Sequence, residues 1–135
     1  MRYPIETIEG VGPAYGKKLR DIGIATTAQM LRRGETPAGR REIAEETGID
    51  HDKVLTFVNI CDLLRIRGVG EEYSELLEAA GVDTVKELRN RNPENLAKAI
   101  AEANETRKLV RQLPSAKHCQ RWVSHAKTLA PMVTY

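Results

Sequence analysis

Residues 8–24 decide the fold, and they read IEGVGPAYGKKLRDIGI. Gly10 and Gly12 flank a valine and permit a turn that side chains would block. Pro13 suits the first position of a helix. We expect this helix to direct Leu19 inward and to end at Gly23, because glycine readily adopts the left-handed conformation that ends helices. The stretch therefore predicts a tight turn followed directly by a short helix.

The same pattern returns 58 residues later as Gly68-Val69-Gly70. Other residues recur at this spacing, namely Tyr15 and Tyr73, Leu19 and Leu77, and Gly23-Ile24 and Gly81-Val82. Self-similarity at one spacing indicates two divergent copies of one structural unit. We expect a first half over residues 1–65 and a second half over residues 66–135, packed as one compact unit.

Residue types that cap helix N-termini predict further helices between and after these turns. Thr26, Thr36, Asp50, Thr84, Asn92 and Ser115 each precede a helix-like pattern and are residue types that cap helix N-termini. Apolar residues at spacings of three and four follow several of these caps, and no stretch alternates with period two for long. The predicted fold is all-α, with two pseudo-symmetric helical repeats.

The glycine turn, its inward leucine and the later Gly-apolar pair resemble the helix-hairpin-helix family. The physical basis is that such a turn leads into a helix N-terminus, where free N–H groups and the helix dipole attract a phosphate oxygen. The resemblance implies one such motif in each half. It also implies that the hairpin amides bind the sugar-phosphate backbone of a nucleic acid, usually duplex DNA, without reading bases.

Three further stretches resemble the uncharacterised DUF4332 family of tandem helix-hairpin-helix proteins. They are the IEGVGP start at residues 8–13, the TPAGR stretch at residues 36–40 and the GVGEEY hairpin at residues 68–73. This resemblance covers most of the chain, and the family implies no established activity.

Charge is banded along the chain, although the net charge is only +2. Residues 12–41 contain seven basic residues against two acidic ones, and residues 69–88 contain six acidic residues against one basic one. We therefore expect the first hairpin to bind nucleic acid. The predicted binding residues are Gly10, Val11, Gly12, Lys17, Lys18, Arg20, Arg40 and Arg41. Arg32 and Arg33 either extend this basic surface or stabilise a helix C-terminus.

The second hairpin, Gly68-Val69-Gly70, should behave differently. Glu71 and Glu72 follow it directly and would repel a phosphate. We expect this hairpin to be structural or to contact a basic protein partner. The alternative function for the whole chain is a protein-interaction or scaffold module.

Other classes of function find little support in the sequence. There is no P-loop, no HExxH and no nucleophile beside a base, so no catalysis is expected. His51, His118 and His125 form no ligand motif, and no metal or cofactor is expected. Trp122, with apolar neighbours at helical spacing, is predicted to be a core anchor. No apolar run could span a bilayer, so we expect no membrane partner and a cytoplasmic location.

Overall fold

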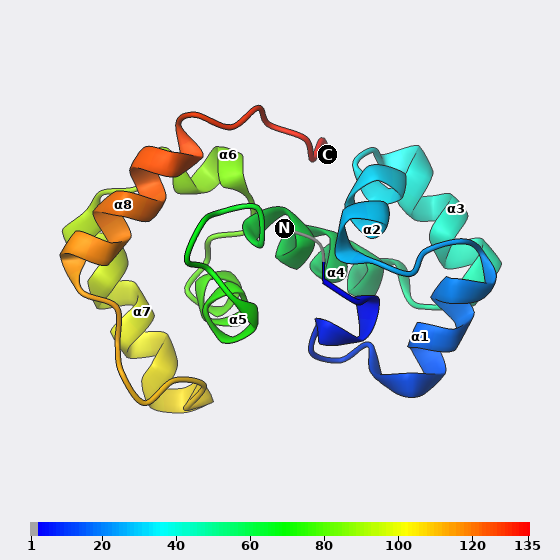
Figure 1. Cartoon of the computed structure of the whole chain (residues 1–135), viewed down its shortest axis with the longest axis horizontal. Coiled ribbons are helices and arrows are strands. Elements are labelled where there is room, and N and C mark those ends of the chain that lie inside the picture. Colours follow the sequence, from blue (N-terminus) through cyan, green and yellow to red (C-terminus); the bar gives the residue numbers. More distant parts are fainter. Residues whose placement is uncertain (1–2) are drawn as a thin grey trace. The chain divides into compact units, whose positions relative to one another are not determined.

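The computed structural model describes residues 3–135, and this part of the chain is all-helical, as predicted (Figure 1). Within it, one short 3-10 helix, η1 (Ile5–Thr7), precedes eight α-helices. These are α1 (Gly12–Asp21), α2 (Thr27–Gly34), α3 (Pro37–Thr47), α4 (His51–Leu63), α5 (Glu71–Ala79), α6 (Val85–Leu88), α7 (Pro93–Arg107) and α8 (Ala116–Ala126). The extended pairing among the described residues is limited to an isolated bridge between Pro4 and Thr26.

The chain divides into two compact units. The first comprises Met1–Asp62 together with Met132–Tyr135, and the second comprises Leu63–Pro131. The boundary thus lies three residues before the one predicted from the sequence, and the last four residues belong to the first unit instead of the second. That the two halves pack as one compact body stays a prediction.

Most of the helices begin at a side chain that caps them, as the sequence indicates. The hydroxyls of Thr26, Thr36, Thr84 and Ser115 and the side chain of Asn92 each accept a hydrogen bond from the backbone N–H three residues later. Such a cap satisfies one of the N–H groups that the first helical turn leaves without a partner. Helix starts are therefore set by short-range interactions.

The core of the first unit lies between its four helices. Helix α2 packs against α3, and α1 packs against both η1 and α3. The side chains that fill this core are almost completely buried and include Ile5, Leu19, Ile24, Met30, Ile43 and Val58. The predicted inward position of Leu19 is confirmed, since its exposed fraction is 0%.

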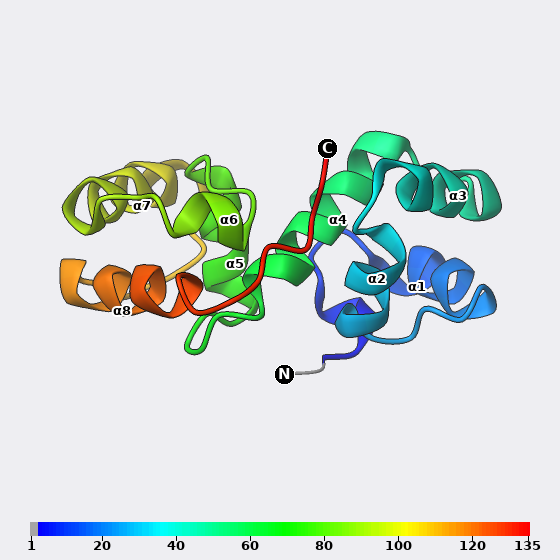
Figure 2. The ribbon, with the colours of Figure 1, turned by 90° about the horizontal axis from the view of Figure 1, so that it is seen from above.

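The second unit has a core of its own. Helix α7 packs against α5 and α8, and α8 also contacts α6. Figure 2 shows α7 and α8 side by side. The buried cluster includes Leu77, Leu88, Leu96, Ile100, Cys119 and Trp122. Trp122 is only 4% exposed, which confirms it as a core anchor.

The two Gly-Val-Gly turns share much of their backbone geometry. The first glycine has a φ of +90° at Gly10 and +86° at Gly68. Each valine amide donates to the carbonyl three residues earlier, at 3.2 Å from Val11 to Ile8 and 3.1 Å from Val69 to Ile66. The second glycine differs: φ is +60° at Gly12 but −95° at Gly70. The two turns thus begin alike and enter their helices differently.

Candidate nucleic-acid interface

The first turn is held against α4 by close packing of its backbone. A Cβ atom at Gly10 would stand 3.5 Å from the ring of Phe57, and the edge of Tyr15 contacts the same ring with centroids 6.5 Å apart. Val11 fills the space under the turn and is 2% exposed. The turn is therefore fixed by its neighbours, and its backbone presents a defined set of amides.

Helix α1 starts without a side-chain cap, unlike most of its neighbours. Its N-cap residue is Val11, which cannot accept a hydrogen bond through its side chain, and its first turn contains no acidic residue. Since Pro13 has no N–H and the amide of Val11 donates to Ile8, the amides of Gly12 and Ala14 are the ones that the helix start leaves for an outside acceptor. Among the α-helices with a described N-cap, α5 is the other one without a side-chain cap. Both uncapped helices follow a Gly-Val-Gly turn.

The cations predicted on α1 lie close to this start, but two of them are paired. Lys17 contacts Asp21 at 3.0 Å, an exposed pair of the kind that contributes little and exchanges readily. Arg20 makes a two-pronged contact with Glu6, at 2.8 Å from Nε and 2.6 Å from Nη2. Lys18 is exposed, and no acidic partner is found for it within residues 3–135.

Glu6 is a neighbour of this helix start that the sequence did not indicate. Its hydrogen bonds with Arg20 hold the pKa of the Glu6 carboxyl at about 2. Its carboxylate lies against Gly16, where a Cβ atom would stand 2.5 Å from Oε2. A hollow of about 630 Å³ is formed here by Glu6, Gly12, Pro13, Lys17, Arg20 and Asp21. The structure thus brings three of the predicted residues, Gly12, Lys17 and Arg20, to one hollow together with two carboxylates.

Lys53 on α4 is a second addition to this region. Its ammonium group lies 5.6 Å from the centre of the Tyr15 ring, a distance typical of a cation–π contact. Tyr15 belongs to the first turn of α1, so Lys53 adds positive charge near the uncapped amides. Because Tyr15 and Lys53 are far apart in the sequence, no local sequence pattern could predict their contact.

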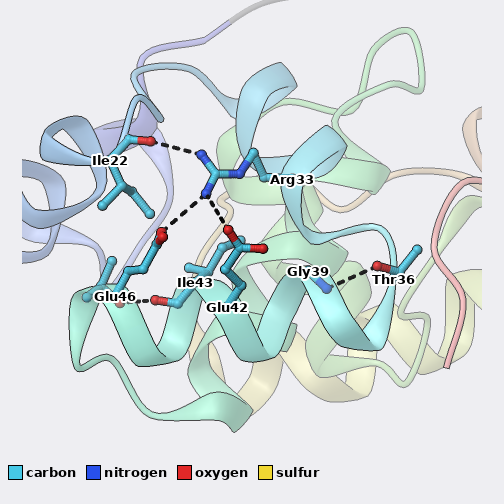
Figure 3. A network of polar contacts seen from close by, with 8 residues as sticks. Ile22, Arg33, Thr36, Gly39, Glu42, Ile43 and Glu46 are labelled. Atoms are coloured by element: carbon cyan, nitrogen blue, oxygen red, sulfur yellow. Dashed lines mark hydrogen bonds and ion pairs between the residues drawn. The ribbon is translucent and has the colours of Figure 1, made fainter.

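Arg33 acts within the fold, as Figure 3 shows. Its Nη1 donates to the carbonyl oxygen of Ile22 at 2.9 Å, and its Nη2 lies 3.3 Å from Glu46 and 3.9 Å from Glu42 on α3. The guanidinium therefore joins the end of α2 to α3 and to the residue after α1. Of the two roles considered for Arg33, the structure favours stabilisation of the helix end.

Arg40 was predicted to bind nucleic acid, and its position corrects that prediction. It is 2% exposed, and it donates to the carbonyl oxygens of Gly34 at 2.9 Å and Thr134 at 2.6 Å. Burial lowers the pKa of its guanidinium. On α3, Arg40 shares the buried face with Ile43 and Thr47, whose spacing is helical. Arg41 is exposed on the same helix.

The second turn is bordered by acidic side chains, as the sequence indicated. Glu71 and Glu72 occupy the first turn of α5 and are exposed. Gly68 packs against Trp122, where a Cβ atom would stand 3.4 Å from the indole Nε1. Tyr73 contacts the same indole, with ring centroids 5.3 Å apart. Tyr73 thus has the packing role that Tyr15 has against Phe57.

The family model for a domain of unknown function, DUF4332, matches residues 9–129. The chain belongs to the DUF4332 family. No curated protein and no solved structure matches this DUF4332 chain. Within residues 3–135, no group of three or more His, Cys, Asp and Glu side chains is arranged to hold a metal ion. In the same part of the chain, every helix is too short or too polar to span a bilayer.

Proposed function

We propose that the chain binds the sugar-phosphate backbone of duplex DNA, without catalysis and without reading bases, through a helix-hairpin-helix formed by η1, the first Gly-Val-Gly turn and α1. The observation that carries the proposal is the uncapped start of α1. Its amides have no side-chain acceptor, whereas in most other α-helices a cap side chain accepts from one amide of the first turn. A phosphate oxygen is the natural acceptor for such a helix start.

The charges near this start support the same function. Lys18 and Lys53 supply cations, Lys17 and Arg20 flank the hollow beside Gly12, and no acidic residue occupies the first turn of α1. The pair between Arg20 and Glu6 holds one of these cations in an internal contact. We therefore assign phosphate contact first to the turn amides and to Lys18, with Lys17 and Lys53 as further contributors.

The corresponding helix of the second unit, α5, supports different roles for the two motifs. Helix α5 also lacks a side-chain cap, but Glu71 and Glu72 occupy its first turn and interact favourably with its dipole. Their charges repel phosphate. In this proposal the two motifs are pseudo-symmetric. The second motif has a structural role, and the first motif binds DNA.

Fluorescence anisotropy of a short labelled DNA duplex at several salt concentrations tests this function. We expect binding that weakens with salt, and binding by a variant Lys17→Glu/Lys18→Glu that is much weaker and is measurable at low salt. Because each phosphate contact contributes roughly −0.9 to the slope of log K against log salt, removing two contacts should reduce that slope by about two. The matched control is Lys86→Glu/Lys98→Glu, which changes the net charge equally at two exposed positions of the second unit.

A protein-interaction module is the second candidate, and the acidic rim of the second turn favours it. Glu71 and Glu72 lie with Lys108 and Arg111 around another hollow of the second unit. A partner bound there would be recognised by charge and by the apolar Leu109 and Val110. Absence of DNA binding at low salt, in a protein whose circular dichroism shows the expected helices, would overturn the first function and favour this one.

A further inference from the structure

The second unit contains a hollow of about 650 Å³ beside its Gly-Val-Gly turn, a volume within the range of small-molecule sites. Its walls come from four places in the unit: the turn with Arg67 and Gly68, Tyr73 of α5, residues 112–114, and α8. The hydroxyl of Tyr73 donates to the carbonyl of Gln112 at 3.1 Å and so ties the wall segment to α5. Asn104 holds the residues just before that segment by accepting from the amides of Leu109 and Val110. The hollow is therefore built on fixed backbone.

Positive charge lines this hollow without a counter-charge. Arg67 and Arg121 both border it and are exposed, and within residues 3–135 neither guanidinium forms an ion pair. None of its lining residues is acidic; Glu71 and Glu72 border the neighbouring hollow instead. Two unpaired guanidinium groups present donors arranged for the oxygens of a phosphate or carboxylate.

Two histidines add donors of defined orientation. The amide of Arg67 donates to Nδ1 of His125 at 2.9 Å, so the neutral ring of His125 carries its proton on Nε2. Nδ1 of His118 is also engaged, since the amide of Ser115 donates to it at 3.4 Å and Oγ of Ser115 lies 2.9 Å from it. Both rings border the hollow. Each therefore has Nε2 as the nitrogen left for a ligand.

Trp122 provides one more unused donor at the edge of the same hollow. The side chain is 4% exposed, and no described residue accepts a hydrogen bond from its indole Nε1. This nitrogen faces Gly68, which has no side chain to cover it. In the first unit Phe57 takes the corresponding place against Gly10 and has no N–H, and Glu9 stands 58 residues before Arg67. The donors of this hollow are thus specific to the second unit.

We propose that this hollow binds the 5′-phosphate of a nucleoside monophosphate, either free or at the end of a strand. The two arginines and the two histidines hold the phosphate. Leu113, Pro114 and the rings of Tyr73 and Trp122 form the apolar wall that a sugar and base require. The Trp122 N–H and the amide of Gln112 offer hydrogen bonds to polar edges of the ligand. The inference does not rest on duplex binding by the first turn, because no residue of the first unit takes part.

The test uses Trp122 as its own reporter. Trp122 is the one tryptophan in the chain, so a ¹⁵N-labelled sample gives a single indole N–H signal. We expect this signal to move when adenosine 5′-monophosphate or a 5′-phosphorylated oligonucleotide is added, and to stay in place with unphosphorylated adenosine. A shift with the mononucleotide identifies a free ligand, and a shift with the oligonucleotide alone identifies a strand end.

Two matched variants make the result specific. Arg67→Gln/Arg121→Gln should weaken binding by about a hundredfold, since each of the two lost bonds to a charged group contributes about a factor of ten. Lys117→Gln/Lys127→Gln removes the same charge from exposed positions on and just after α8 that lie outside the hollow, and it should bind as the unmodified chain does. The remaining amide signals check that each variant is folded.

Three outcomes would overturn the proposal. The first is no movement of the indole signal with either phosphorylated ligand. The second is equal binding by the Arg67→Gln/Arg121→Gln variant. The third is inorganic phosphate moving the signal at the same concentrations as the mononucleotide, which would show a bare anion site with no recognition of the nucleoside. Each can occur whether or not Lys17→Glu/Lys18→Glu abolishes binding of duplex DNA.

Discussion

Arg40 donates a hydrogen bond of 2.6 Å from Nη2 to the carbonyl oxygen of Thr134, which lies 94 positions later in the chain. The amide of Thr134 in turn donates to the carbonyl of Glu35 at 2.8 Å, and the hydroxyl of Tyr135 donates to Asn59 at 3.2 Å. Val133 is 6% exposed between them. A buried arginine, used as a donor to main-chain oxygens, thus fixes the end of the chain to the first unit.

Replacing Arg40 with methionine should lower the free energy of unfolding. Methionine keeps an apolar stem but leaves the carbonyls of Gly34 and Thr134 without their charged donor, and such bonds contribute about 1.5–3 kcal/mol each before relaxation. Urea denaturation measures the change. Arg41→Met, at an exposed position on the same helix, should leave stability within about 0.5 kcal/mol of the original. Equal effects of the two substitutions would contradict the structural role of Arg40.

Alanine substitutions at the second glycine of each turn should affect stability differently. Alanine at Gly12 must adopt a φ of +60° and should destabilise the chain by about 1 kcal/mol. Alanine at Gly70 meets a φ of −95° and open space, so it should be neutral or stabilising by up to about 1 kcal/mol. Thermal unfolding of the two variants compares them. Equal losses of stability in the two variants would contradict the different φ angles of Gly12 and Gly70.

The ion pair of Glu6 and Arg20 predicts a particular response to acid. The pKa of Glu6 lies at about 2, below its ordinary value of 4.5, so the pair stabilises the fold above pH 4.5. That contribution is lost as the pH falls from 4.5 towards 2. Arg20→Gln should raise the pKa of Glu6 towards 4.5, as followed by carboxyl NMR signals during acid titration. Lys17→Gln serves as control and should leave the pKa of Glu6 in place, because Lys17 pairs with Asp21.

The two cysteines should report on the opening of the two units separately. Cys61 and Cys119 are free and buried; burial raises the pKa of the Cys61 thiol, and it raises that of Cys119 to about 11. Since the thiolate is the reactive form, both should react with a thiol reagent far more slowly in the folded chain than in denaturant. Variants Cys61→Ala and Cys119→Ala leave one reporter in each unit. Rapid labelling of either folded variant would contradict the burial described above.

Local interactions explain why so much of the helical order could be predicted from the sequence. Thr26, Thr36, Thr84, Asn92 and Ser115 each bond an amide three residues away, so residue type and spacing suffice to place these helix starts. The glycine turns are equally local, because the left-handed backbone of Gly10 and Gly68 is one that few other residues adopt.

The residues that sequence reasoning misplaced have partners far along the chain. Arg40 looked like surface charge because its acceptor, Thr134, is remote, although its helical spacing with Ile43 already pointed inward. Arg20 looked free because Glu6 precedes the turn. The hollow around Arg67 and Arg121 could not be predicted at all, since these side chains meet only through the packing of α8 beside the second turn.

Because Met132–Tyr135 belong to the first unit, the two units obtain their complete sets of residues in a particular order on the ribosome. Residues 3–62 emerge before the second unit, but the first unit lacks the contacts of Val133 and Thr134 until Met132–Tyr135 have been synthesised. The second unit, Leu63–Pro131, is contiguous and has all its residues before then. Nascent domains usually mature from the N-terminus onwards. Here the second unit has all its residues before the first unit does.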